Sequence, residues 1–162
     1  MNIVPKISLI MSVYNGEDYL AETIESVLCQ TFAEWEFIII NDCSTDNTSK
    51  ILAEYASKDE RIKVHTNENN LKLPSSLNKA LSLAKGKYIA RMDSDDIAFP
   101  DRFEKQYAFM ESHPDVFVCG SKAIFFKDGA LPDIKPAEQT KKQYTFIKKT
   151  DYEFDLIYLN ED

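Results

Sequence analysis

Residues 7–13 read Ile-Ser-Leu-Ile-Met-Ser-Val, a nearly continuous apolar run that leads into polar residues. A second run, the phenylalanine and three isoleucines at 37–40, does the same. Short runs of this kind are typical of strands that are buried on both faces of a parallel sheet. The two runs therefore predict neighbouring central strands.

Segments with helical periodicity lie between the predicted strands. Leu20, Ile24, Val27 and Leu28 recur at helical spacing, with Asn15, Glu17 and Asp18 before them as expected capping residues. Strands that alternate with crossover helices predict an α/β fold with a mainly parallel sheet flanked by helices. The further predicted helices begin near Asp46, at Pro74 with Gly86 as the stop, and at Pro100, and the further strands cover 61–65, 88–92 and 116–119.

Composition narrows the class of protein. A chain of 162 residues suits one globular domain, and its net charge of -8 disfavours nucleic acid as a partner. Three cysteines without CxxC spacing indicate reduced thiols in a cytoplasmic protein rather than disulfides or zinc. No apolar run approaches the roughly 20 residues of a membrane span. Any association with the inner face of the membrane is thus expected to be peripheral.

Polar residues follow three of the predicted strands. Tyr14 and Glu17 follow the first, Asp42 follows the second, and the acidic cluster 93–96 follows the fourth. Ligands of open parallel sheets bind at these carboxyl ends, so the three loops are expected to face one site. Three carboxylates within four residues repel one another, and a divalent cation would relieve that repulsion.

The residue spacing excludes two other kinds of site, a calcium-binding loop and a glycine-rich phosphate-binding loop. A calcium loop beginning at Asp42 would need glycine at its sixth position and glutamate at its twelfth, where Asn47 and Ala53 stand. The four glycines form neither GxGxxG nor GxxxxGK[ST], the loops that cradle phosphates. A diphosphate bound here would therefore need a metal ion.

The ordered blocks resemble the donor-binding part of inverting family-2 glycosyltransferases with the GT-A fold. The resemblance covers about residues 5–121 and rests on four blocks with Pro100 and Arg102. The blocks are Ile7 to Glu17, Gln30-Thr31-Phe32, Ile39 to Asp46 and Ala90 to Asp96. It implies a nucleotide-sugar-binding α/β domain over 1–121. Beyond it, 122–162 is a weakly patterned extension, expected to form part of the acceptor side.

The resemblance also implies roles for individual residues. A nucleotide-sugar donor, commonly a UDP-sugar, would lie against Ser12, Val13, Tyr14 and Glu17, with Asp42 bonded to the base. Asp93 would lie near the ribose and the metal, and Asp95 would ligate Mn²⁺ or Mg²⁺. Asp42 is expected to bind the base rather than to stabilise the second helix, for which Asp46 is better placed as a cap. The remaining expected donor contacts are Arg91 and Ser94.

The acceptor side is less defined by the sequence. Inversion needs a base that takes the proton of the acceptor hydroxyl, and Asp162 in the terminal Glu161-Asp162 pair is the candidate. The expected acceptor is a glycan or a lipid-linked sugar. Two alternatives stay open: a catalytically incomplete nucleotide-sugar-binding module of the same fold, and a receiver-like phosphotransfer domain.

Overall fold

The computed structural model describes residues 4–121 and the strand 144–148. The described chain divides into two compact units, the first reaching Glu104 and the second beginning at Lys105. The predicted division into 1–121 and 122–162 stays a prediction, since most of the second segment, with Asp162, lies outside the described residues.

The first unit contains a parallel sheet of four strands in the order β3-β2-β1-β4. In this sheet β1 pairs with β2 from Ile7↔Trp35 to Val13↔Asn41, which brings the two predicted apolar runs side by side. The strands are β1 (Ile7–Val13), β2 (Trp35–Asn41), β3 (Ile62–Thr66) and β4 (Tyr88–Arg91). The sheet and its direction agree with the sequence prediction.

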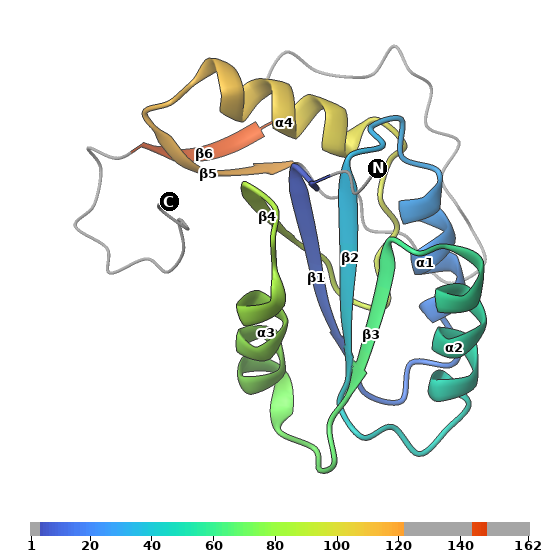
Figure 1. Ribbon diagram of the computed structural model, residues 1–162. Coiled ribbons are helices and arrows are strands. Elements are labelled where there is room, and N and C mark those ends of the chain that lie inside the picture. The colour runs from blue at the N-terminus through green and yellow to red at the C-terminus, as the bar shows by residue number, and fades with distance from the viewer. Residues whose placement is uncertain (1–3, 122–143, 149–162) are drawn as a thin grey trace. The chain divides into compact units, whose positions relative to one another are not determined.

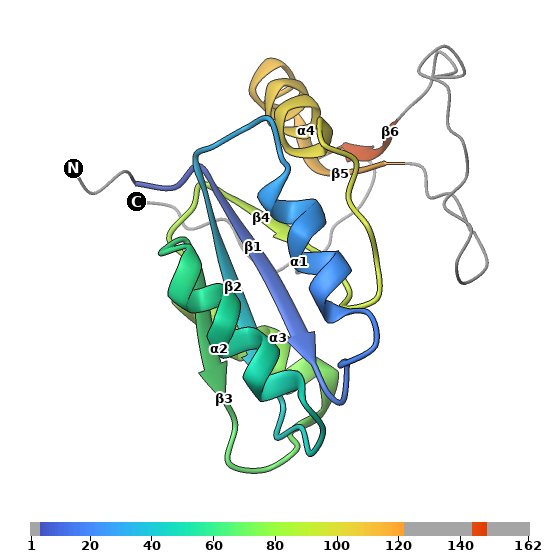
Figure 2. The ribbon, with the colours of Figure 1, turned by 90° about the vertical axis from the view of Figure 1, so that its right-hand side faces the viewer.

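Helices cover both faces of the sheet. α3 (Lys72–Leu83) lies on one face, against β1 and β2, and α1 (Leu20–Leu28) and α2 (Thr48–Lys58) lie on the other (Figures 1 and 2). All seven residues of β2 are buried, as expected for a strand covered on both sides. Ile38 and Ile40 pack against Ala80 of α3, and burying each such side chain stabilises the fold by about 1.5–3 kcal/mol.

The predicted helix signals were only partly correct. Tyr19 holds the N-cap position of α1 without a side-chain hydrogen bond, so the predicted capping by Asn15, Glu17 and Asp18 is wrong. Gly86 does not stop α3, which ends three residues earlier at Leu83. Instead, Gly86 crosses β1 so closely that a Cβ there would lie 2.5 Å from the nitrogen of Ser8. Close backbone approach explains this glycine.

The second unit holds most of α4 (Arg102–Ser112) and a separate two-stranded antiparallel sheet. In that sheet β5 (Val116–Ser121) pairs with β6 (Tyr144–Lys148), with a register shift between Val116 and Val118. The sequence predicted β5 but not β6, which lies where its hydrophobic periodicity is lost. No helix in the described part of the chain is both long and apolar enough to span a bilayer.

Candidate functional site

The loops that follow β1 and β2 are joined by hydrogen bonds. The amides of Asn15, Gly16 and Glu17 donate to Ser44 Oγ, Thr48 Oγ1 and Asp46 Oδ2 at 3.0, 2.9 and 3.1 Å. In return, Asn15 Oδ1 accepts from the amide of Thr45 at 2.8 Å, and Glu17 Oε2 accepts from the amide of Asn47 at 2.9 Å. Asn47 holds the N-cap position of α2 without a side-chain hydrogen bond, so the predicted cap at Asp46 is one residue off. Asp46 Oδ1 still accepts from the amide of Thr48, the first residue of α2, at 3.0 Å.

The loop after β4 lies beside the loop after β1. A Cβ on Gly16 would be 3.7 Å from Ser94 Oγ, which places the two loops in near contact. Helix α1 holds the loop after β4 in place, because Thr23 Oγ1 donates to the carbonyl of Ser94 at 2.9 Å. The structure thus brings together the loops after β1, β2 and β4, and we call residues 12–17, 42–46 and 91–96 the strand-end site.

Asp42 is built into the fold at this site. Its side chain is 2% exposed, and its carboxylate accepts from Asn67 Nδ2 and the amides of Leu71 and Lys72, each at 2.8 Å. Burial opposes its ionisation, but these hydrogen bonds and one from Ser76 outweigh burial and lower the pKa of Asp42. The carboxylate of Asp42 thus anchors the loop that leads into α3, a role that the sequence did not predict. Its predicted role at the base stays a prediction.

Asn67 completes this anchor and was not among the predicted site residues. Asn67 is 4% exposed, and its amide also donates to Ser76 Oγ at 2.9 Å. The signal was present in the sequence, because Asn67 directly follows β3 just as Asp42 directly follows β2. A buried polar residue at a strand end needs hydrogen-bond partners, and its partners here are the neighbouring loops.

The other residues expected to contact the sugar donor differ in how accessible their side chains are. Tyr14 is 52% exposed at the end of β1, so its ring is accessible to a ligand. Glu17 is bonded to Asn47 through its carboxylate, and Ser12 is half-buried at the end of β1 with Val13 buried beside it. Of the residues predicted to contact the donor, Tyr14 has an accessible aromatic ring, whereas the carboxylate of Glu17 is used to join two loops.

The acidic loop carries an ion pair at its first member. Arg91 Nη2 lies 2.6 Å from Asp93 Oδ1, and both side chains are about half exposed. Burial raises the pKa of Asp96, and the charges of Asp93 and Asp95 raise it further. A surplus of negative charge thus remains in this loop despite Arg91.

The carboxylates of the acidic loop suit a hard cation whose coordination is completed by a bound ligand and water. Among residues 4–121 and the strand 144–148, no three His, Cys, Asp or Glu side chains converge on a common point. Magnesium is commonly held by one or two carboxylates together with substrate phosphates and water, so a full protein cage is not required. Asp95 is exposed, and Asp93 lies two residues before it, so both offer carboxylate oxygens to such an ion.

The fold and the strand-end site define an α/β protein whose site brings together polar loops and carboxylates. Residues 8–158 match the model of the glycosyl transferase family 2, and the chain belongs to that family. EpsE of Bacillus subtilis is 48% identical over 129 residues, which cover 79% of this chain and 46% of EpsE.

The names of two further similar proteins state a substrate or a bound ligand. WfgD of Escherichia coli, a UDP-Glc:α-D-GlcNAc-diphosphoundecaprenol β-1,3-glucosyltransferase, is 39% identical over 118 residues, covering 73% of this chain and 46% of WfgD. The structure of S. aureus TarS 1–349 in complex with UDP-GlcNAc superposes with a TM-score of 0.64 at 36% identity, covering 68% of this chain and 33% of TarS 1–349. This likeness confirms the predicted GT-A fold. The chain spans about half the length of the curated relatives it matches.

Proposed function

We propose that the strand-end site binds a nucleotide-diphosphate sugar, specifically a UDP-sugar, as the donor of an inverting, metal-assisted glycosyl transfer. The observation that carries the proposal is the convergence of the loops after β1, β2 and β4 in a chain of glycosyl transferase family 2. WfgD, by its name, uses UDP-Glc, and TarS has been solved with UDP-GlcNAc, which supports uridine as the base.

The residues of the site suggest a division of tasks. Tyr14 offers its exposed ring to the base, and the Asp42 oxygen that faces Lys72 accepts from the base in addition to that amide. Asp95 and Asp93 would hold Mn²⁺ or Mg²⁺, with Ser94 between them beside Gly16. When bound, the cation neutralises charge on the departing diphosphate as a Lewis acid.

Arg91 is the residue that must change partner when the donor binds. Its guanidinium pairs with Asp93, which is one of the two proposed metal ligands. Release of Arg91 from Asp93 would free both side chains, the carboxylate for the cation and the guanidinium for a diphosphate oxygen. Exposed ion pairs contribute only about 0–1 kcal/mol, so the exchange costs little.

The acceptor is proposed to be a glycan or a lipid-linked sugar, as the name of WfgD indicates for that relative. The candidate base for its hydroxyl, Asp162, stays a prediction. A protein that only binds the donor would differ from an enzyme in one respect, since it would show UDP-sugar affinity without turnover.

Calorimetric titration of UDP, with Mn²⁺ and then with excess EDTA, tests the donor site. Affinity should fall sharply on chelation, because the acidic loop otherwise repels a diphosphate. Asp95→Asn should reproduce the loss, whereas Asp18→Asn, which removes an exposed carboxylate outside the site, should not. Undiminished affinity in EDTA would refute metal-assisted binding.

A further inference from the structure

Charge is unevenly distributed along this chain. Residues 61–91 contain seven of its 19 lysines and arginines but only one of its 27 acids, Glu68. The other residues thus hold 12 basic and 26 acidic side chains. The basic segment runs from the start of β3 through α3 to the end of β4, and the sequence of α3 contains no acid.

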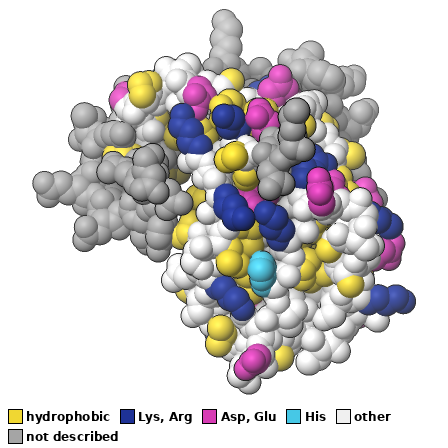
Figure 3. Space-filling model, in the orientation of Figure 1, with side chains coloured by type: hydrophobic (Ala, Val, Ile, Leu, Met, Phe, Trp, Pro, Cys, Tyr) yellow, Lys and Arg dark blue, Asp and Glu magenta, His cyan; other side chains and the backbone are white. Residues whose placement is uncertain are grey.

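The fold gathers part of this segment on one side of the sheet. Figure 3 shows that side, on which dark-blue Lys and Arg side chains lie near a cyan histidine. Lys63 and His65 alternate along β3 and so project to the same face, on which α3 also lies. We define the basic face as Lys63, His65, Lys72, Lys79 and Lys85.

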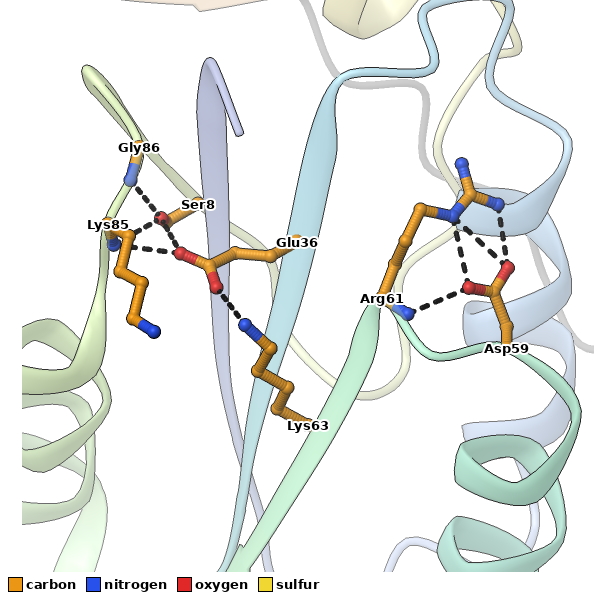
Figure 4. Close-up of polar contacts among 7 residues, drawn as sticks. All are labelled: Ser8, Glu36, Asp59, Arg61, Lys63, Lys85 and Gly86. Atoms are coloured by element: carbon orange, nitrogen blue, oxygen red, sulfur yellow. Dashed lines mark hydrogen bonds and ion pairs between the residues drawn. The ribbon is translucent and has the colours of Figure 1, made fainter. Parts of the chain in front are cut away.

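One acid lies under this face, and it is enclosed. Glu36 is 3% exposed and pairs with Lys63 at 2.7 Å, while Ser8 Oγ and the amide of Lys85 donate to its other oxygen at 2.6 and 2.8 Å (Figure 4). In the same view the side chain of Lys85 extends away from the carboxylate. The charge of Glu36 is thus balanced by Lys63.

The other lysines of the face keep their charge available. Within the described residues, no carboxylate pairs with Lys72, Lys79 or Lys85. Lys79 donates to a neutral partner, Asn67 Oδ1, at 2.8 Å. A face with three uncompensated lysines in a chain of net charge -8 favours an anionic partner that approaches from this side.

Apolar side chains beside the lysines indicate which anionic partner. Leu71 and Leu73 flank Lys72 and are 48% and 45% exposed. Exposed leucines among lysines suit the headgroup region of a bilayer, where apolar side chains enter and cations meet lipid phosphates. Nucleic acid offers phosphates but no apolar layer for these leucines.

We propose that the basic face docks on the anionic surface of a lipid bilayer. Lipid phosphates would lie opposite Lys72, Lys79 and Lys85, and Leu71 and Leu73 would enter the headgroup boundary. The choice of a bilayer rests on the proposed transfer to a lipid-linked acceptor, which such docking would bring to the strand-end site. The attraction is electrostatic, so it weakens as salt concentration rises.

Co-sedimentation of the 162-residue chain with lipid vesicles tests the docking. Vesicles of phosphatidylcholine with about one third phosphatidylglycerol should bind the chain at low salt, and pure phosphatidylcholine vesicles should not. Lys79→Gln with Lys85→Gln removes two charges from the basic face. Each lost lysine should weaken vesicle binding roughly fivefold, and both together about 25-fold.

The matched control is Lys50→Gln with Lys58→Gln, which removes two charges from α2 on the opposite face of the sheet. The control should bind vesicles like the unchanged chain, and circular dichroism establishes that both variants fold. Equal losses in both variants, or no binding by the unchanged chain, would overturn the proposal. UDP titration of the same preparations keeps the two ideas apart, because failure to bind UDP would refute the donor site and leave vesicle binding intact.

Discussion

At the scale of single residues, the carboxylate of Asp42 stabilises an unusual backbone conformation at Lys72. Lys72 has a φ of 69°, in the left-handed region, and in that conformation its amide donates to Asp42 Oδ2 at 2.8 Å. A side chain with a Cβ is strained in this region, whereas glycine is not. The hydrogen bond to Asp42 therefore holds a strained residue beside the strand-end site.

Lys72→Gly should raise the free energy of unfolding by about 1 kcal/mol, because the strain of the left-handed lysine disappears. Lys72→Ala is the matched variant, since it removes the charge but keeps the Cβ, and it should leave stability unchanged. Urea unfolding monitored by circular dichroism measures both. A Lys72→Gly variant less stable than Lys72→Ala would show that the lysine conformation is not strained.

Asp42→Asn should lower both stability and UDP affinity, because an NH2 group replaces one of two oxygens and leaves at least one of three N–H donors without its acceptor. Leaving even one buried donor unsatisfied costs about 1–3 kcal/mol. Asp95→Asn, at an exposed position of the same site, should keep the stability of the unchanged chain. Unfolding in urea and UDP titration separate the two effects, and full stability of Asp42→Asn would assign Asp42 to ligand binding alone.

At the scale of elements, the segment between α3 and β4 passes β1 at Gly86, which has no room for a side chain. A Cβ at Gly86 would meet backbone atoms of Ser8 and Ile7 at 2.5 and 2.7 Å. A Cβ at Gly16 would have its one close contact with a side-chain atom, Val13 Cγ2 at 2.6 Å, and not with backbone. Gly86→Ala should therefore lower the melting temperature much more than Gly16→Ala, and equal shifts would contradict the close crossing.

The cluster around Glu36 predicts a pH dependence of stability. Burial opposes the ionisation of Glu36, but hydrogen bonds from Lys63, Ser8 and the Lys85 amide outweigh it and lower its pKa from 4.5. A lowered pKa in the folded state contributes stability that is complete above about pH 4.5 and is lost as the pH falls through the folded-state value. The stability advantage over Glu36→Gln should shrink in acid, as urea unfolding at several pH values would measure. An advantage independent of pH would exclude ionised Glu36 as its source.

The strands were predictable from sequence because their residues obey one local rule. The apolar run at 7–13 predicted all of β1, and the run at 37–40 predicted the centre of β2 but not its first two residues, Trp35 and the polar Glu36. The roles of Asn15 and Glu17 were not predictable, because each is settled by a partner about 30 residues away. Gly86 was misjudged for the same reason, since its constraint comes from Ser8 across the sheet.

At the scale of the whole molecule, the parallel sheet and the strand-end site lie within the first unit. All four strands of the sheet and the helices α1 to α3 end before Glu104. A fragment of residues 1–112, which retains all of α4, should therefore unfold cooperatively and bind UDP as tightly as the 162-residue chain. Far-UV circular dichroism and UDP titration measure this. A fragment without a cooperative transition would show that the sheet needs the second unit.

The hydroxyl of Ser8 has a consequence for the order in which the chain can fold during synthesis. It accepts from the amides of Lys85 and Gly86, residues made 77 and 78 positions after it. Until they leave the ribosome, Ser8 of β1 and Glu36 of β2 lack part of their hydrogen bonds in an apolar setting. We therefore expect β1 to complete its hydrogen bonds only after the segment that leads into β4 has been made. A ribosome stalled while Gly86 is still in its exit tunnel would hold a protease-sensitive chain.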